Sequence, residues 1–199
     1  MPELERIALV DMDGTIADFD GQLQKDLDAM RAPGEQPYET HPGDHPDYIE
    51  ARASAIKRVP GWWRNLPRYE PGFRIVDLLK GYDFRIHILT KGPFHNTGAW
   101  AEKVDWVRVN LPEATISITE DKGLSYGAVL VDDWAPYALR WLEHRPRGLV
   151  IMPAHPWNEG FDHPRGKHPN VVRFTGTLES LEEVKLRIEK RLGVIRLGF

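Results

Sequence analysis

The sequence lacks several features that would assign it to common classes of protein. None of its 199 residues is cysteine, which excludes disulfide bonds, thiolate nucleophiles and cysteine-based zinc sites. Basic residues are not in excess, because 26 lysines and arginines face 30 aspartates and glutamates, and we therefore expect no binding to nucleic-acid polymers. No apolar run approaches the length of a membrane span, and the acidic N-terminus does not resemble a signal peptide. These absences predict a cytoplasmic protein with no membrane partner.

The chain does contain enough apolar material for a substantial core. Hydrophobic residues make up 41% of it and aromatic residues 10%. Its length fits one domain, or one domain that carries a modest insertion.

The stretch from Ile7 to Thr15 combines a buried strand with a polar loop. Its first four residues are apolar and indicate a strand of the kind that parallel sheets bury on both faces. Asp11 and Asp13 follow directly, and Gly14 allows the backbone to turn sharply. Taken alone, this pattern also fits an ordinary aspartate-rich turn. If the strand belongs to a parallel sheet, both carboxylates lie at the edge where such sheets form their active sites.

From Pro71 onward, apolar strands alternate with amphipathic helices. Strands are expected at residues 84–89, 114–119, 128–131, 148–152 and 171–174, and helices at 73–80, 100–111, 135–144 and 178–192. This alternation predicts an α/β fold with a Rossmann-like parallel sheet that is covered by helices on both faces.

Residues 19–70 interrupt this alternation. Apolar residues at helical spacing predict two helices there, joined by a long loop over 32–47 that is rich in proline and glycine. We therefore expect a small helical cap at 19–70, inserted into a core that is formed by residues 1–18 and 71–199. We also expect the 32–47 loop to become ordered only when a substrate binds.

Chemically reactive side chains follow the expected strands at four places. These are Asp11 with Asp13, Thr90 with Lys91, Lys122, and Asp132 with Asp133. The carboxyl ends of parallel strands share one edge of the sheet, so these groups can converge. Clustered carboxylates in a poorly hydrated site need a cation, and oxygen ligands alone favour a hard ion such as Mg²⁺. A hydroxyl and an ammonium beside such a site suit a phosphate, which makes phosphoryl transfer the expected reaction.

The same four segments resemble the motifs of the haloacid-dehalogenase-like phosphohydrolases. These motifs are Asp-x-Asp-Gly-Thr after an apolar strand, a threonine that ends a second strand, a lysine, and paired aspartates after a later strand. The resemblance implies that Asp11 is the nucleophile, which forms an aspartyl-phosphate. It implies that Asp13 is the general acid, which protonates the leaving alkoxide, later activates water, and binds Mg²⁺ through its backbone carbonyl. A true dehalogenase usually lacks that second aspartate, because its reaction leaves no oxygen to protonate.

The remaining motif residues would hold the substrate and the metal. By the same resemblance, Thr90 and Lys122 bind the oxygens of the transferring phosphoryl group. Asp11 and Asp133 would ligate Mg²⁺ directly, and Asp132 would act on it through water.

A closer resemblance is to the 5'(3')-deoxyribonucleotidases. It rests on Asp-Met-Asp-Gly at 11–14, Ala-Asp-Phe at 17–19, Pro-Gly-Trp-Trp-x-x-Leu-Pro at 60–67, Trp-Val at 106–107 and Asp-Lys at 121–122. It implies that Phe19, Trp62 and Trp63 stack on a nucleobase, an interaction worth roughly 1–3 kcal/mol per base. The chain departs from that family at two places. Trp62-Trp63 replaces a pair of phenylalanines, and Thr90-Lys91-Gly92 replaces Thr-Ser-Pro, so that Lys91 adds a charge to the substrate pocket.

The sequence therefore predicts a Mg²⁺-dependent phosphomonoesterase, with a (deoxy)nucleoside monophosphate as the expected substrate and a homodimer as a possible assembly. One alternative is a phosphatase that acts on a sugar or polyol phosphate. Another is a non-catalytic domain that binds a phosphorylated ligand, because fold alone does not fix function. A third alternative is a phosphomutase, although nothing in the sequence points to the second phosphate site that it would need.

Several other large side chains are expected to have structural roles. Four tryptophans are expected to pack helices on the sheet: Trp100, Trp106, Trp134 and Trp141. Three histidines are expected in a solvent-exposed loop, because their spacing matches no usual zinc site: His155, His163 and His168.

Overall fold

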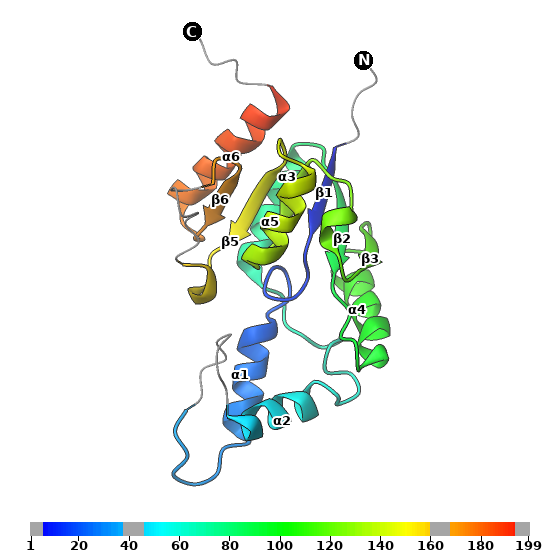
Figure 1. The fold of residues 1–199 in the computed structure, drawn as a ribbon, viewed down its shortest axis with the longest axis vertical. Helices are drawn as coiled ribbons and strands as arrows, with labels where there is room; N and C mark the ends of the chain where they lie inside the picture. Colours follow the sequence, from blue (N-terminus) through cyan, green and yellow to red (C-terminus); the bar gives the residue numbers. More distant parts are fainter. Residues whose placement is uncertain (1–5, 38–45, 160–167, 194–199) are drawn as a thin grey trace.

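The computed structural model describes residues 6–37, 46–159 and 168–193, and its centre is a six-stranded parallel sheet (Figure 1). The strands are β1 (Ile7–Val10), β2 (Arg85–Thr90), β3 (Thr115–Ile118), β4 (Val129–Val131), β5 (Leu149–Pro153) and β6 (Val171–Phe174). Their order across the sheet is β3-β2-β1-β4-β5-β6, which is the order of a doubly wound α/β fold. The predicted fold class is confirmed, and the strand ends lie within one residue of those expected.

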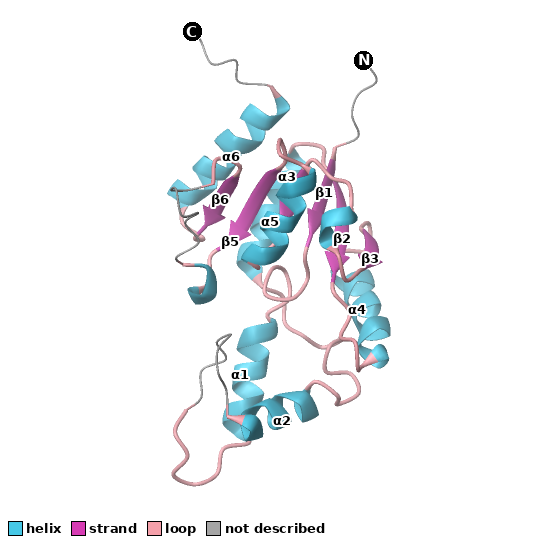
Figure 2. Cartoon of the chain, in the orientation of Figure 1, coloured by secondary structure: helices cyan, strands magenta, loops and turns pink. Residues whose placement is uncertain are grey.

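Helices cover both faces of this sheet (Figure 2). The helices α3 (Glu70–Gly81), α4 (Thr97–Asn110) and α6 (Leu178–Leu192) pack on one face, and α5 (Ala135–His144) packs on the other. Two short 3-10 helices, η1 (Lys122–Leu124) and η2 (Pro156–Asn158), follow β3 and β5. Side chains alternate along β1, because Ala8 and Val10 face the first set of helices and Leu9 faces α5. No helix in the described part of the chain is long and apolar enough to cross a membrane.

The four tryptophans that were expected to pack against the sheet divide into two pairs. Trp106 and Trp141 are fully buried, and their indole N–H groups donate to backbone carbonyls, which satisfies the polar end of each ring. The prediction is wrong for the other two. Trp100 is 36% exposed and covers Gly92, where a Cβ would lie 2.3 Å from the ring. Trp134 lines the pocket described below. Both lie near the start of a helix, where the chain has already left the sheet.

In its described residues, the segment between β1 and α3 forms two helices beside the carboxyl edge of the sheet (Figure 1). Helix α1 (Phe19–Ala29) begins after Asp18, whose side chain accepts a hydrogen bond from the Gly21 N–H. Helix α2 spans Asp47–Ile56. These helices share a small apolar cluster made of Leu23, Leu27, Ile49 and Ile56. The loop expected at 32–47 lies largely outside the described residues, and the division into core and cap stays a prediction.

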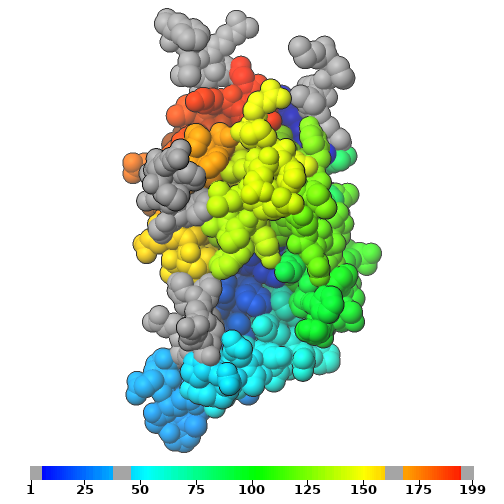
Figure 3. Space-filling model, in the orientation of Figure 1, coloured from blue at the N-terminus to red at the C-terminus, as the bar shows by residue number. Residues whose placement is uncertain are grey.

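A recess separates these two helices from the sheet. In Figure 3, the dark-blue residues that follow β1 are visible at its base, between the yellow and green core and the cyan α2 segment.

Candidate active site

The loop after β1 carries its carboxylates to the carboxyl edge of the sheet. The Asp11 N–H donates to the Val131 carbonyl at 2.8 Å, which extends the pairing of β1 with β4 by one residue. The chain then turns back, because the N–H groups of Ile16 and Ala17 both donate to the Met12 carbonyl. The order of the strands reverses beside β1, and doubly wound sheets bind their ligands at such a point.

Two glycines allow the close approaches that this loop requires. Gly14 has a φ of +69°, and a Cβ at this position would lie 2.8 Å from Oδ2 of Asp133. A Cβ on Gly72, at the start of α3, would lie 1.7 Å from the carbonyl oxygen of Thr15. Any larger side chain at either position would push the loop away from its neighbours.

Lys122 lies among the carboxylates at this edge. Its Nζ is 2.8 Å from Oδ1 of Asp11 and 2.8 Å from Oδ2 of Asp132. Asp133 lies beside them, and one carboxylate oxygen from each of the three aspartates lies within 4.8 Å of the others. All four side chains are buried, so a single ammonium faces three carboxylates away from bulk water.

Burial and mutual repulsion shift the pKa values in this cluster. Desolvation raises the pKa of Asp133 well above its usual range, and the charges of Asp132 and Asp11 raise it further. Desolvation also raises the pKa of Asp132 to about 6, although Lys122 opposes this shift. Burial alone would lower the pKa of Lys122, but the attraction of Asp11 and Asp132 outweighs it and the pKa rises. Full ionisation of the cluster would thus place more negative charge there than its one lysine compensates.

The same cluster has the chemistry of a site for a hard metal ion. If Asp11, Asp132 and Asp133 are all ionised, Lys122 leaves two negative charges uncompensated, which matches one divalent cation. Carboxylate oxygens are the ligands that Mg²⁺ prefers, and no softer donor belongs to the group. These three aspartates could therefore hold a metal ion.

Asp13 pairs with a second buried lysine, Lys103 of α4, which the sequence motifs do not predict. The Lys103 ammonium contacts Oδ2 of Asp13, and it also donates to Thr90 Oγ1 at 3.0 Å and to the Lys91 carbonyl at 2.8 Å. Oδ1 of Asp13 is buried and has no hydrogen-bond partner among the described residues. Desolvation raises the pKa of Asp13, although Lys103 opposes this shift. Asp13 thus has one oxygen anchored by Lys103 and one that no described residue binds.

A signal for Lys103 is present in the sequence. Ala99, Trp106 and Val107 form the buried face of α4, and Lys103 lies on the same face at helical spacing. A lysine at such a position must find a carboxylate or a set of carbonyls to bind, because an unpaired buried charge is very unfavourable.

Side chains from three segments hold Asp133. Thr15 Oγ1 donates to Oδ1 at 2.9 Å, and the Trp157 indole N–H donates to Oδ2 at 3.0 Å. The side-chain amide of Asn158, itself buried, donates to the Asp133 carbonyl at 3.0 Å. Arg173 of β6 donates from Nε and Nη2 to Oδ1 of Asn158. This network fixes the position of Asp133 from the far side of the site.

The prediction of an exposed histidine loop is wrong for His155. Its ring is half-buried and stacks on Trp157, with ring centroids 4.2 Å apart, while its Nε2 donates to the Gly14 carbonyl at 2.6 Å. Desolvation lowers the pKa of His155, which favours the neutral ring. His168 is also half-buried, and His163 lies outside the described residues. The spacing of the histidines in the sequence does not indicate that the chain after β5 packs against the β1 loop.

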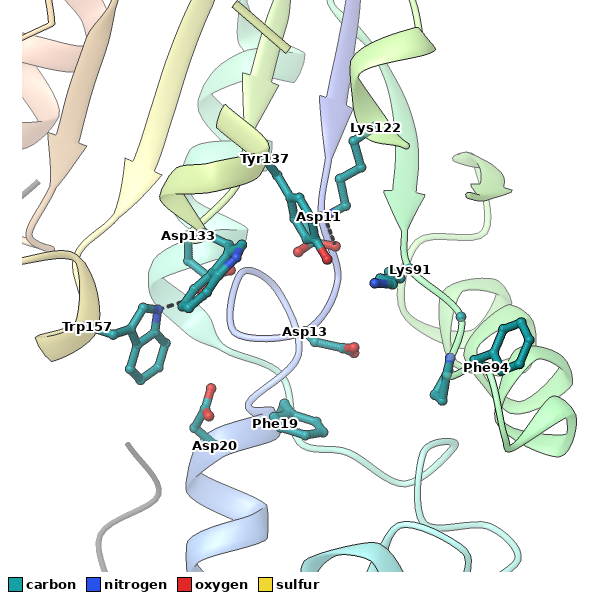
Figure 4. Close-up of a pocket in the computed structure, with 13 residues that line it drawn as sticks. Asp11, Asp13, Phe19, Asp20, Lys91, Phe94, Lys122, Asp133, Tyr137 and Trp157 are labelled. Carbon is teal, nitrogen blue, oxygen red and sulfur yellow. Dashed lines mark hydrogen bonds and ion pairs between the residues drawn. The ribbon is translucent and has the colours of Figure 1, made fainter. Parts of the chain in front are cut away.

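A pocket of about 430 Å³ opens at this cluster (Figure 4). Its lining includes Asp11, Asp13, Asp20, Asp133, Lys91, Lys122, Phe19, Phe94, Trp134, Tyr137 and Trp157. In Figure 4, the Lys91 ammonium extends into the space beside Asp11 and Asp13, and Phe19 lines the pocket from the first turn of α1. The pocket thus presents carboxylates and ammonium groups at its base and aromatic rings on its walls.

Other residues predicted for the site lie outside this lining. Thr90 is fully buried at the end of β2, and its hydroxyl accepts from Lys103, so its own proton remains available for donation. Trp62 and Trp63 do not line the pocket. They pack against Phe19 with ring centroids 5.5 and 5.4 Å away, and the Trp62 indole N–H donates to a carboxylate of α1. The binding roles of these three side chains stay predictions.

Comparison with known proteins identifies a shared fold. No family model matches the sequence, and no curated protein matches it. Among solved structures, a dehalogenase is similar over 92% of this chain and 98% of its own length, with 13% identity and a TM-score of 0.52. The HAD-hydrolase YfnB from Bacillus subtilis, solved bound to magnesium, is similar over 92% of this chain and 99% of its own, with 15% identity and a TM-score of 0.52. The chain therefore shares the α/β fold of these two structures.

Proposed function

We propose, from this shared fold and the buried carboxylates at the carboxyl ends of β1 and β4, that the protein is a Mg²⁺-dependent hydrolase of small phosphomonoesters. The observation that carries the proposal is the cluster of Asp11, Asp132 and Asp133 around Lys122. Its excess negative charge and its oxygen ligands suit a divalent cation. The pocket above it is wide enough for a small ligand.

In this proposal, Asp11 attacks phosphorus and Asp13 acts as the general acid and then the general base. A carboxylate oxygen of Asp11 forms a bond to phosphorus while the ester P–O bond breaks, and the leaving alkoxide takes a proton from Asp13. Asp13 then accepts a proton from the water that attacks the aspartyl-phosphate, and phosphate leaves as the bond to Asp11 breaks. The raised pKa of Asp13 and its free Oδ1 support this role, because the group must hold a proton before the first step.

The lysines and the metal would stabilise the charge on the phosphoryl group. Lys122 and the Thr90 hydroxyl would donate to its oxygens, and Lys91 adds a further positive charge within the same pocket. Mg²⁺, held by Asp11 and Asp133 with Asp132 acting through water and the Asp13 carbonyl completing the set, would offset the negative charges of carboxylate and phosphate.

The proposal also specifies the substrate, which is a nucleotide. Phe19 lines the pocket, and Trp62 and Trp63 pack behind it, so that an aromatic wall stands where the leaving group would lie. A nucleobase is flat and stacks well on such a wall. A (deoxy)nucleoside monophosphate is therefore the substrate we propose, and a sugar phosphate is the alternative that a substrate panel would reveal.

The proposal is tested by measuring phosphate release from p-nitrophenyl phosphate, dUMP, dTMP and sugar phosphates in the presence of Mg²⁺. We expect hydrolysis that a chelator abolishes, and a loss of roughly 10³-fold or more in kcat for Asp11→Asn, because the nucleophile is gone. Asp77→Asn, which changes an exposed aspartate of α3, is the matched control. Equal rates for wild type and Asp11→Asn would contradict the proposed chemistry. Hydrolysis of sugar phosphates without hydrolysis of dUMP or dTMP would contradict the nucleotide assignment.

A further inference from the structure

A second cavity of about 270 Å³ adjoins the catalytic pocket. The two share Phe19, Pro93 and Phe94 in their linings. The second cavity is formed between α2, the residues that follow it, and the loop after β2. Its other lining residues are Ser54, Lys57, Arg58, Trp63, His95 and Asn96.

The charge of this second cavity is opposite to that of the catalytic pocket. Among the described residues, four aspartates line the catalytic pocket, whereas the second cavity has no carboxylate in its lining and carries Lys57 and Arg58. The Lys57 side chain is half-buried, and its ammonium has no hydrogen bond or ion pair with any described residue. Desolvation lowers the pKa of Lys57, and the more distant charges of Asp13 and Glu50 offset this only in part. A half-buried ammonium that no described residue pairs is stabilised when a ligand supplies an anion.

Lys57 is also fixed in place at this junction. Its backbone carbonyl accepts from the Trp63 indole N–H at 2.9 Å and from the Asn96 side-chain amide at 2.8 Å. Asn96 caps the start of α4, so these bonds tie the end of α2 to the start of α4. The lysine therefore emerges from a well-held backbone beside the aromatic rings of Phe19 and Trp63, and it does not belong to a freely moving surface loop.

We propose that the substrate is a phosphomonoester whose leaving group carries a second anionic group, either a phosphate or a carboxylate, which Lys57 binds with support from Arg58. This inference rests on the proposed function and specifies its substrate class. The transferable phosphoryl group occupies the catalytic pocket, the apolar middle of the substrate passes between Phe19 and Phe94, and the second anion lies in the second cavity. An ion pair in this partly desolvated cavity is stronger than one on the open surface, so it gives real selectivity.

Matched pairs of probes test this inference. Each pair differs by one anion: deoxythymidine 5'-monophosphate against deoxythymidine 3',5'-bisphosphate, and glycerol 3-phosphate against 3-phosphoglycerate. We expect kcat/KM to favour the member with the extra anion at least tenfold in one pair, which also distinguishes phosphate from carboxylate. Lys57→Met keeps the aliphatic stem and should remove most of that preference through a higher KM. Arg58→Gln should have a smaller effect, because Arg58 is exposed.

Lys25→Met is the matched control, because Lys25 is an exposed lysine of α1 outside both cavities. It should leave the preference unchanged. A preference below threefold in both pairs, or an equal loss on both members of a pair in Lys57→Met, would overturn the inference. Calorimetric titration of the same probes into Asp11→Asn with Mg²⁺ separates this outcome from failure of the proposed function. Selective binding that depends on Lys57 would support the anion site even if wild type releases no phosphate, and equal binding of both members would refute it.

Discussion

At the scale of single residues, the site depends on two buried lysines that divide the carboxylates between them. Lys122 binds Asp11 and Asp132, while Lys103 binds Asp13. The division separates the proposed nucleophile from the proposed general acid. Because Lys103 also donates to Thr90 and to the Lys91 carbonyl, it links the loop after β2 to the loop after β1. We therefore regard Lys103 as a positioning residue.

Replacement of Lys103 tests that role. We expect Lys103→Met to lower kcat by about 100-fold, because small displacements of catalytic groups have effects of this size. We also expect it to lower the free energy of unfolding by about 2 kcal/mol, because Asp13 and Thr90 lose a buried partner. Steady-state kinetics and urea unfolding measure the two effects. The double variant Lys103→Met with Asp13→Asn should regain part of the stability. A double variant that loses the sum of both single effects would show that the two residues act independently.

At the scale of elements, strands were more predictable than the contacts that complete the site. Each strand has a local apolar pattern, and parallel pairing follows from the alternation with helices, so β1 to β6 and their shared edge could be predicted. Lys103 was missed because a lysine within a helix usually points to solvent. The side chains around Asp133 were missed because they come from η2 and β6, which meet the β1 loop only in the folded chain. Trp134 was misassigned because sequence does not show which way a helix start faces.

The segment after β5 should make the stability of the folded protein depend on pH. Burial favours the neutral ring of His155, which donates to the Gly14 carbonyl. The pKa of His155 is therefore lowered in the folded state, whereas in the unfolded chain it is about 6.5. As the pH falls through that unfolded value, the unfolded chain takes up the proton more readily, and stability is lost. Glutamine can still donate to the Gly14 carbonyl but does not titrate. We therefore expect wild type to lose more stability than His155→Gln between pH 7.5 and 5.5, as measured by urea unfolding.

The control for this experiment is His144→Gln, which changes an exposed histidine at the end of α5. Its stability should follow that of wild type across the same range. A constant difference between wild type and His155→Gln at every pH would show that His155 contributes packing alone.

At the scale of the whole molecule, the site joins residues that are far apart in the chain. Asp11 follows β1 and Asp133 follows β4, and β2 and β3 lie between them in the sequence. The two aspartates meet only because β1 and β4 are neighbours in the sheet. A metal ion that binds this cluster therefore binds the folded protein and not the unfolded chain, so binding must stabilise the fold as a whole. Without the ion, the buried and mutually repelling carboxylates oppose folding.

Removal of one of those carboxylates should therefore have opposite effects with and without metal. We expect Asp133→Asn to raise the metal-free Tm by about 2–4 °C, which corresponds to roughly 1 kcal/mol in a chain of this size. The amide can still accept from the Trp157 indole, and the Thr15 hydroxyl can rotate to accept from its N–H, so the network around the position survives.

Mg²⁺ at 100 times its Kd should stabilise wild type by about 2.7 kcal/mol, and it should stabilise Asp133→Asn far less. Thermal unfolding with Mg²⁺ and with a chelator measures all four values, with Asp77→Asn as the control. A metal-free Asp133→Asn that melts below wild type, or that gains as much from Mg²⁺, would show that Asp133 is a structural group and not a metal ligand.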